Sequence, residues 1–277
     1  MNLTEPRVLK TLLKRYGITP QKRFGQHYLC SAHVVDKIVE SVGEVKGILE
    51  VGPGPGILTH ALSTKCEQYI AIEIDPKAVL MLSETAPTAQ IILGDVLQFD
   101  LKEIIEKLPI PRALVSNMPY QITGPLLGKF AELRNYYTKA VLMMQKEVGE
   151  RVLAIPGTKN HGSLSVFLQS QFKIKKLLNV SAGSFLPPPK VESVVLELIP
   201  KLTGLSFNQE SLFFKFVRVG FTHPRKTLAN NLASGFKKER VKIEMLLKEN
   251  GLEILIRPHQ LNLENWRTLF ENYEQQS

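Results

Sequence analysis

The sequence predicts an α/β fold in which a parallel, doubly wound sheet is followed by a small all-helical domain. Strand-like apolar runs alternate with helix-like segments from residue 47 to about residue 133. This alternation is typical of a parallel sheet whose strands are joined by helices. A glycine-rich loop directly follows the first strand, and from about Lys201 onward only helical spacing remains.

The N-terminal segment is predicted to be helical and basic. Apolar residues at helical spacing predict a helix over residues 4–16, which Gly17 and Pro20 end. A basic turn follows over residues 21–29, and Ser31 is a suitable N-cap for the next helix.

The first strand of the sheet, residues 47–51, leads directly into the loop Gly52-Pro53-Gly54-Pro55-Gly56. Three glycines within five residues allow the backbone to approach a ligand closely. The second strand, residues 69–74, carries Glu73, which lies 21 residues after Gly52. A carboxylate at about this separation binds the ribose hydroxyls in a Rossmann-type site. The alternative for Glu73 is a solvated charge at a strand end.

Two further strands also end in polar side chains. The third strand, residues 90–93, ends at Gly94-Asp95, and the fourth, residues 113–116, ends at Asn117. Ligands of open α/β sheets bind outside the carboxyl ends of the strands. A nucleoside could use these ends together, with the loop against the ligand, Glu73 on the ribose and Asp95 on the adenine amino group. Asp95 could instead be a helix or turn cap.

The segment Asn117-Met118-Pro119-Tyr120 combines an amide, a rigid turn and an aromatic ring. The amide provides an acceptor and two donors, Pro119 stiffens the backbone, and Tyr120 offers a flat face for stacking. This set suits an exocyclic amino group on a planar ring. An ordinary turn after a strand is the alternative.

The second half of the chain completes the sheet and then becomes helical. Helices are expected over residues 122–133 and 163–172, with another starting at about residue 145. Strands are expected over residues 139–144, 173–180 and 191–199. The three prolines at residues 187–189 form a stiff extended segment that can hold Phe185 near the same edge of the sheet, although core packing is an equal alternative for Phe185. Helical spacing around Phe213 and Trp266 marks the C-terminal domain.

The composition limits the class of protein. The net charge of +9 is confined to the two ends, with +5 in residues 1–30, zero in residues 31–200 and +4 in residues 201–277. A neutral body with basic ends indicates a polyanionic partner, although a merely soluble basic protein is the alternative. There is no transmembrane run, and the two cysteines favour a reducing cytoplasm. The six histidines show no metal-ligand spacing, so no metal is expected.

Together these segments resemble the ribosomal RNA adenine dimethyltransferases, specifically the bacterial small-subunit family linked with kasugamycin sensitivity. The resemblance covers nearly the whole chain. It rests on residues 23–29, 50–54, 73–75, 94–95, 117–120, 145–147 and 185–193. The chain departs from the family pattern at His27, where the family usually has Asn, and at Met118, where it usually has Leu.

The resemblance implies an enzyme with a Rossmann-like class I methyltransferase sheet. The methyl donor would be S-adenosylmethionine, and the targets would be two adjacent adenosines near the 3′ end of 16S ribosomal RNA, each dimethylated on N6. The catalytic residues would be Asn117, Pro119, Tyr120 and Phe185. The cofactor-binding residues would be His27, Leu29, Gly52, Gly54, Glu73, Asp95 and Asn117.

The expected domains are a basic arm over residues 1–30, a cofactor-binding catalytic domain over residues 31–200 and a helical RNA-binding domain over residues 201–277. The candidate RNA contacts are Arg23, Arg218, Arg225, Lys226, Lys237, Lys238 and Arg240. A cytoplasmic monomer that acts on 16S rRNA in the immature small subunit is expected, without a membrane or a metal. Two alternatives stay open, namely a 23S rRNA adenine methyltransferase of the macrolide-resistance type and a non-catalytic RNA-binding assembly factor.

Overall fold

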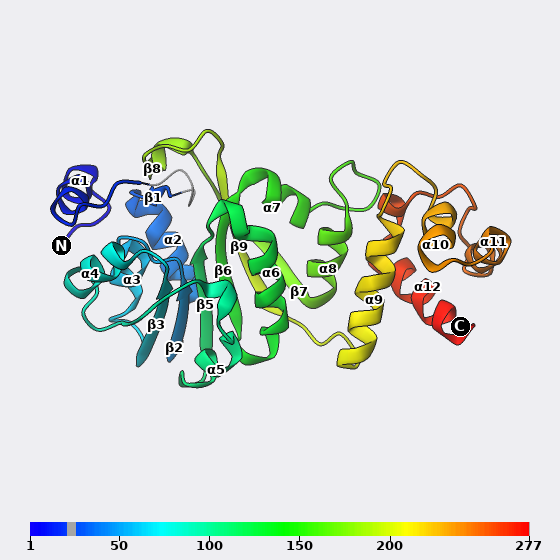
Figure 1. Cartoon of the computed structure of the whole chain (residues 1–277), viewed down its shortest axis with the longest axis horizontal. Coiled ribbons are helices and arrows are strands. Elements are labelled where there is room, and N and C mark those ends of the chain that lie inside the picture. The colour runs from blue at the N-terminus through cyan, green and yellow to red at the C-terminus, as the bar shows by residue number, and fades with distance from the viewer. Residues whose placement is uncertain (21–25, 277) are drawn as a thin grey trace. The chain divides into compact units, whose positions relative to one another are not determined.

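The structure is a computed structural model that describes residues 1–20 and 26–276. The chain divides into two compact units (Figure 1). The first comprises Met1–Gly149 and Lys173–Pro200, and the second comprises Glu150–Phe172 and Lys201–Ser277. The helical second unit thus includes residues 150–172 as well as the segment that follows Lys201.

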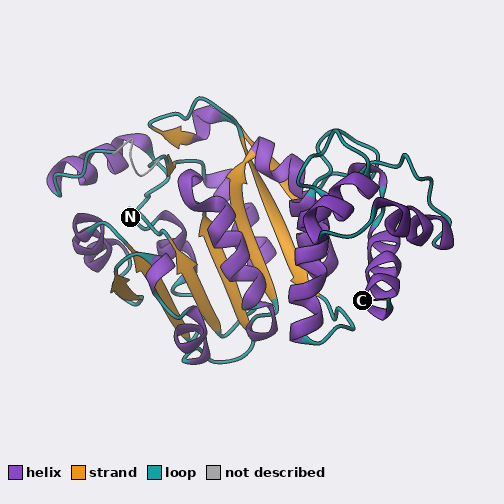
Figure 2. Ribbon diagram, turned by 45° about the vertical axis from the view of Figure 1, so that its right-hand side comes forward, coloured by secondary structure: helices purple, strands orange, loops and turns teal. Residues whose placement is uncertain are grey.

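The first unit is built on a seven-stranded sheet in the order β4-β3-β2-β5-β6-β9-β7. Figure 2 shows the strands in orange and the helices around them in purple. The strands are β2 (Gly47–Val51), β3 (Gln68–Glu73), β4 (Gln90–Leu93), β5 (Arg112–Asn117), β6 (Lys139–Gln145), β7 (Phe172–Val180) and β9 (Ser193–Pro200). Strands β4, β3, β2, β5 and β6 pair in parallel, and β9 pairs antiparallel to β6. The predicted doubly wound α/β sheet is therefore confirmed.

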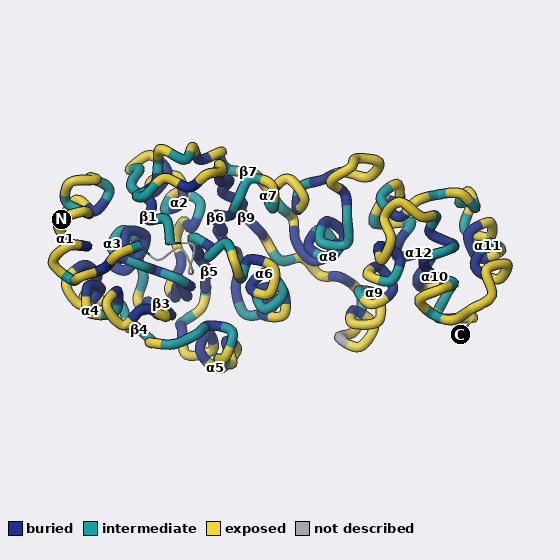
Figure 3. Tube along the Cα trace, turned by 45° about the horizontal axis from the view of Figure 1, so that its top comes forward, coloured by how far each residue is buried: buried dark blue, intermediate teal, exposed yellow. Residues whose placement is uncertain are grey.

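The central strands are apolar because both of their faces are covered. All five residues of β2 are buried, and so are the first five residues of β5. Figure 3 draws buried stretches of the chain in dark blue, for example beside the label of β6. Such continuous burial is characteristic of parallel strands between two layers of helices. It places the polar strand-end residues at the boundary between this core and solvent.

Seven α-helices of the described chain belong to the first unit, and their starts agree only in part with the sequence signals. The helices are α1 (Pro6–Arg15), α2 (Ala32–Val42), α3 (Ile57–Leu62), α4 (Pro76–Thr85), α5 (Leu101–Glu106), α6 (Thr123–Glu132) and α7 (Lys146–Val152), the last of which continues into the second unit. Asp75 caps α4 by accepting a hydrogen bond from the Lys77 N–H. Ser31 stands at the N-cap position of α2, but within the described chain its side chain makes no capping hydrogen bond.

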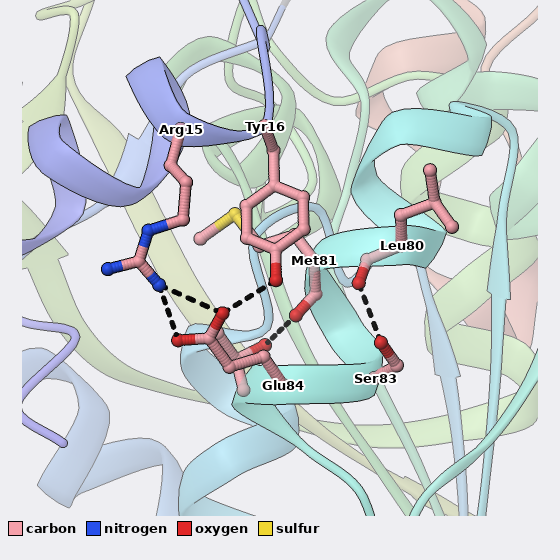
Figure 4. A network of polar contacts seen from close by, with 7 residues as sticks. Arg15, Tyr16, Leu80, Met81, Ser83 and Glu84 are labelled. Atoms are coloured by element: carbon pink, nitrogen blue, oxygen red, sulfur yellow. Dashed lines mark hydrogen bonds and ion pairs between the residues drawn. The ribbon is translucent and has the colours of Figure 1, made fainter.

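Helix α1 is held against α4 by a polar cluster (Figure 4). The Arg15 guanidinium lies 3.0 Å from the Glu84 carboxylate, and the Tyr16 hydroxyl donates to the same carboxylate at 2.6 Å. The Lys77 ammonium donates to the Gly17 carbonyl at 2.8 Å. The chain therefore leaves α1 from a fixed point on the surface of the sheet unit.

The second unit contains α8 (Ser163–Gln171), α9 (Phe207–Gly220), α10 (Leu228–Phe236), α11 (Arg240–Glu249) and α12 (Leu263–Gln275). Its core is aromatic. The Phe216 ring lies edge-on to the Trp266 ring, with 6.1 Å between the ring centroids, and its centroid lies 5.7 Å from that of Phe270. Ser206, Thr227 and Asn262 cap α9, α10 and α12, respectively. The predicted C-terminal helical region is confirmed.

Gly56 provides a test of the packing between α3 and α4. Its φ is +87°, and a Cβ there would lie 2.7 Å from Thr85 Oγ1 and 2.8 Å from Leu82 Cδ2. We expect Gly56→Ala to lower the free energy of unfolding by about 2–4 kcal/mol, measured by urea denaturation. The backbone strain of an alanine at positive φ and the steric overlap of its Cβ with Thr85 and Leu82 both contribute to this loss.

Gly17→Ala is the matched control. Gly17 also has a positive φ of +60°, but the nearest atom to its added Cβ is Lys77 Nζ at 3.7 Å, an ordinary van der Waals contact. The control should cost about 1 kcal/mol from backbone strain alone. Equal losses for the two variants would contradict the steric argument.

Candidate functional site

A cavity of about 270 Å³ lies at the carboxyl ends of the parallel strands. Five segments contribute to its wall, each from a different strand end or from the N-terminal segment. They comprise residues 26–29, 50–58 (apart from Gly56), 72–74, 94–96 and 117–122. The structure thus brings together Gly52, Gly54, Glu73, Asp95 and Asn117, as their positions at successive strand ends predicted.

The glycine loop turns sharply between β2 and α3. Gly52 has a φ of +72° and Gly54 a φ of +53°, which favour glycine. A Cβ on Gly54 would come within 3.2 Å of the Tyr28 ring, so a side chain at this position would also crowd Tyr28. The Gly54 N–H donates a 2.8 Å hydrogen bond to Glu73 Oε2, which joins the loop to the end of β3.

Glu73 is a buried acceptor and not a solvated surface charge. Its side chain is 4% exposed. Oε1 accepts hydrogen bonds from the Ile74 and Asp75 N–H groups, each at 2.9 Å, in addition to the Gly54 bond on Oε2. Burial raises the pKa of this carboxyl, and the three N–H donors act in the opposite direction.

Asp95 is a helix cap, the alternative that the sequence offered for it, and it also lies on the cavity wall. Its carboxylate caps the short helix η2 (Val96–Gln98) by accepting from the Leu97 N–H at 2.9 Å. The residue also lines the cavity. Capping fixes one carboxylate oxygen, Oδ1, and the direction of the side chain with it.

Asn117 lies at the end of β5, where its amide is tied to the N-terminal segment. Its Nδ2 donates to the His27 carbonyl at 3.3 Å. Met118 beside it is buried, and Pro119 lies next to the glycine loop, since a Cβ on Gly52 would be 3.6 Å from the Pro119 ring. The bond to His27 uses one of the two N–H groups of Nδ2, and the amide oxygen Oδ1 is the acceptor that Asn117 can offer to a ligand.

Tyr120 and His27 form a pair of rings on the cavity wall. Their centroids are 5.8 Å apart with an interplanar angle of 29°. The hydroxyl of Tyr120 is 2.9 Å from Ser193 Oγ, and His27 Nδ1 is 2.8 Å from the Pro187 carbonyl oxygen. Burial raises the pKa of the Tyr120 phenol.

Phe185 is not part of the cavity wall. It belongs to strand β8 (Phe185–Leu186), which pairs antiparallel with β1 (Tyr28–Leu29), so that Phe185 lies opposite Leu29. The Phe185 side chain is only 3% exposed and packs in the core, which is the alternative that the sequence left open. Leu29 is also buried, but it lines the cavity.

Two features of the site were missed by sequence reasoning. Glu50, inside the apolar strand β2, is buried and lines the cavity, and its Oε2 accepts from Thr59 at 2.6 Å and Tyr69 at 2.8 Å. Burial raises its pKa to about 7. The Tyr28 hydroxyl is buried without a hydrogen-bond partner in the described chain. A charged residue within an apolar strand was the available signal for Glu50.

The candidate RNA contacts of the second unit are all exposed. They are Arg218, Arg225, Lys226, Lys237, Lys238 and Arg240. Arg240 also forms an ion pair with Glu244 at 2.7 Å. Arg23, the remaining candidate, lies outside the described residues.

Neither a metal cluster nor a membrane span is found in the described part of the chain. No three His, Cys, Asp or Glu side chains of residues 1–20 and 26–276 gather closely enough to hold a metal ion. Among the same residues, no helix has the length and apolar character needed to cross a bilayer.

Comparison with known proteins relates this site to RNA methylation. The sequence model of the family described as ribosomal RNA adenine dimethylase matches residues 18–275. The chain is 35% identical to ribosomal RNA small subunit methyltransferase A of Natranaerobius thermophilus, over 98% of this chain and 97% of that protein. The protein of the same name from Bacillus mycoides is also 35% identical, over 97% and 96% of the two chains.

Solved structures show the same fold. A dimethyladenosine transferase from Plasmodium falciparum superposes with a TM-score of 0.76 and 26% identity, over 90% of this chain and 98% of that one. The 23S rRNA methyltransferase ErmE superposes with a TM-score of 0.67 and 24% identity, over 89% and 99%. These matches agree with the resemblance carried by the sequence motifs.

Glu50 should make stability depend on pH. Because its folded pKa of about 7 lies above the ordinary value of 4.5, the stability linked to its protonation is complete below pH 4.5 and is lost as the pH rises through 7. Glu50→Gln should remove this decline, which amounts to roughly 3 kcal/mol at most. Urea denaturation at pH 5, 6, 7 and 8 measures it. The same decline in both proteins would contradict the assignment.

Proposed function

The chain belongs to the ribosomal RNA adenine dimethylase family, and on that premise we propose that it dimethylates N6 of two adjacent adenosines near the 3′ end of 16S rRNA. The observation that supports this most directly is the cavity at the strand ends. It combines a ribose-type acceptor at Glu73, a close-approach loop at Gly52 and Gly54, and an amide followed by an aromatic ring at Asn117 and Tyr120.

The residues present fit S-adenosylmethionine as the methyl donor. A carboxylate offers about four acceptor positions, and in Glu73 three are filled by backbone N–H groups, which leaves one on Oε2 for a ribose hydroxyl. Asp95 would accept from the adenine amino group, while His27 and Leu29 would flank the methionine end. When bound, the sulfonium cofactor supplies an electrophilic methyl group.

The chain's own contribution to the chemistry is positioning. The target N6 attacks while neutral and loses its proton after transfer, so no strong base is required. Asn117 Oδ1 would accept one amino hydrogen and orient the nitrogen lone pair, while Pro119 fixes the turn and Tyr120 stacks on the extruded adenine. Orientation of this kind can lower a barrier by roughly 7–11 kcal/mol. Phe185, buried in the core, would need to be uncovered before it could contact the other face of the base.

The fixed amide of Asn117 also suits two successive transfers. Since Nδ2 is directed to the His27 carbonyl, the amide presents one acceptor to the substrate. One acceptor oxygen on Asn117 needs only one N–H on the target N6 to make its hydrogen bond. The nitrogen still carries one hydrogen after the first methylation, so the same contact can orient both rounds.

The second unit would supply the phosphate contacts. Its candidate residues are exposed basic side chains, and cations that neutralise phosphates provide most of the non-specific affinity for RNA. We further propose that the substrate is the immature small ribosomal subunit and that the enzyme acts as a monomer in the cytoplasm.

The proposed activity can be tested with purified protein, labelled S-adenosylmethionine and small subunits that lack the modification. Nucleoside mass analysis should find dimethyladenosine at two adjacent positions near the 3′ end of 16S rRNA. Methylation of 23S rRNA instead would favour the macrolide-resistance type, and absence of turnover would favour a non-catalytic assembly factor.

In this assay Asn117→Ala should lower the single-turnover rate at least about 100-fold, because the acceptor that orients N6 is lost. The thermal unfolding midpoint should change little. Asn135→Ala, which alters an exposed amide of the same unit, is the control and should keep the full rate. A near-normal rate for Asn117→Ala would rule out its orienting role.

Reversing Lys237 and Lys238 to Glu should weaken RNA binding and reduce its salt dependence. The slope of log K against log salt should fall by about 1–2, or roughly one for each lost phosphate contact. Reversing Lys65 and Lys107, which are exposed on the first unit, makes the same change in net charge. Equal effects of the two double variants would indicate a general charge effect and no local contact.

A further inference from the structure

The segment from Phe185 to Ser193 contacts the wall of the cavity at three points. Strand β8 pairs with β1, the Pro187 carbonyl lies 2.8 Å from His27 Nδ1, and Ser193 Oγ lies 2.9 Å from the Tyr120 hydroxyl. The proposed reaction gives Ser193 no role. Its contact with Tyr120 links this segment to a ring that is proposed to touch the substrate.

Ser193 is held rigidly. It is fully buried as the first residue of β9, where it pairs with Gln145 of the neighbouring strand β6. Immediately before it, the Glu192 carbonyl accepts from the Lys146 N–H at 2.9 Å, and the Glu192 carboxylate pairs with the Lys146 ammonium at 2.7 Å. The Ser193 hydroxyl therefore projects from a fixed backbone.

Tyr120, in contrast, stands on a short element. It opens the three-residue helix η3 (Tyr120–Ile122), which has no side-chain cap within the described chain. The ring is only half-buried, and it contacts the His27 ring on one side and the Ser193 hydroxyl at its tip. The hydrogen bond to Ser193 is therefore the contact that holds the tip of this side chain in place.

We propose that Ser193 is a positioning residue, which holds the tip of the Tyr120 ring where the ring can stack on the target adenine. The proposal rests on the stacking role proposed for Tyr120. Without the Ser193 hydroxyl, the Tyr120 hydroxyl loses its partner and the side chain is free to swing about its Cα–Cβ bond. Fewer enzyme–RNA complexes would then hold N6 in line with the methyl donor.

Two variants that remove either end of the contact test the proposal. Ser193→Ala and Tyr120→Phe should each lower the single-turnover methylation rate about three- to tenfold, the usual range for loss of one hydrogen bond. The double variant should be no slower than the slower single variant, because both substitutions break the same bond. The Kd for S-adenosylmethionine should stay unchanged in all three variants.

Ser170→Ala is the matched control, since Ser170 is also buried but donates to the Phe167 carbonyl in α8. It should leave the rate unchanged. Multiplicative loss of rate in the double variant would overturn the proposal, and so would a Ser193→Ala protein that is less stable but methylates at the normal rate.

Tyr120→Ala separates this proposal from the proposed function. If Tyr120→Ala lowers the rate far more than Tyr120→Phe but Ser193→Ala has no effect, the stacking role stands and the positioning role fails. If Tyr120→Ala itself methylates normally, the stacking role fails and the proposal for Ser193 fails with it.

Discussion

The buried carboxylate of Glu73 is the constraint on which the site depends. It accepts from Gly54 on one side and from Ile74 and Asp75 on the other, so it joins the glycine loop after β2 to the turn after β3. The loop can reach this position because Gly52 and Gly54 adopt positive φ angles. A buried charge needs such donors, and two of the three donor residues, Gly54 and Ile74, also line the cavity.

The other half of the cavity depends on contacts between distant parts of the sequence. The N-terminal segment reaches the cavity from helix α1, which Glu84 holds through Arg15 and Tyr16. Strands β1 and β8 then bring residues 28–29 beside residues 185–186. His27, Tyr120 and Ser193 meet at this junction, and Asn117 is fixed there by the His27 carbonyl. The orientation that we propose for the target nitrogen would thus rely on tertiary contacts as well as on strand ends.

The sequence predicted the sheet and the grouping of its polar strand-end residues because both follow from local pattern. Parallel strands end at one edge, so Gly52, Glu73, Asp95 and Asn117 could be placed together once their strands were recognised. The pairing of β1 with β8, the burial of Phe185 and the contact of Ser193 with Tyr120 are long-range features that no local periodicity encodes. Glu50 was missed as a site residue because its two hydroxyl partners, Thr59 and Tyr69, lie on other elements.

The most direct test of this account is the affinity of the Glu73→Gln variant for S-adenosylmethionine, measured by calorimetry. The side chain of the Glu73→Gln variant would have an NH₂ group in place of one carboxylate oxygen. This donor would face at least one of the three backbone N–H donors, so the glycine loop or the turn after β3 must move. The variant should bind at least about tenfold more weakly, or roughly 1.4 kcal/mol. Asp100→Asn, which changes a helix-capping carboxylate outside the cavity lining, should bind normally. Unchanged affinity of a folded Glu73→Gln protein would contradict the central role of this carboxylate.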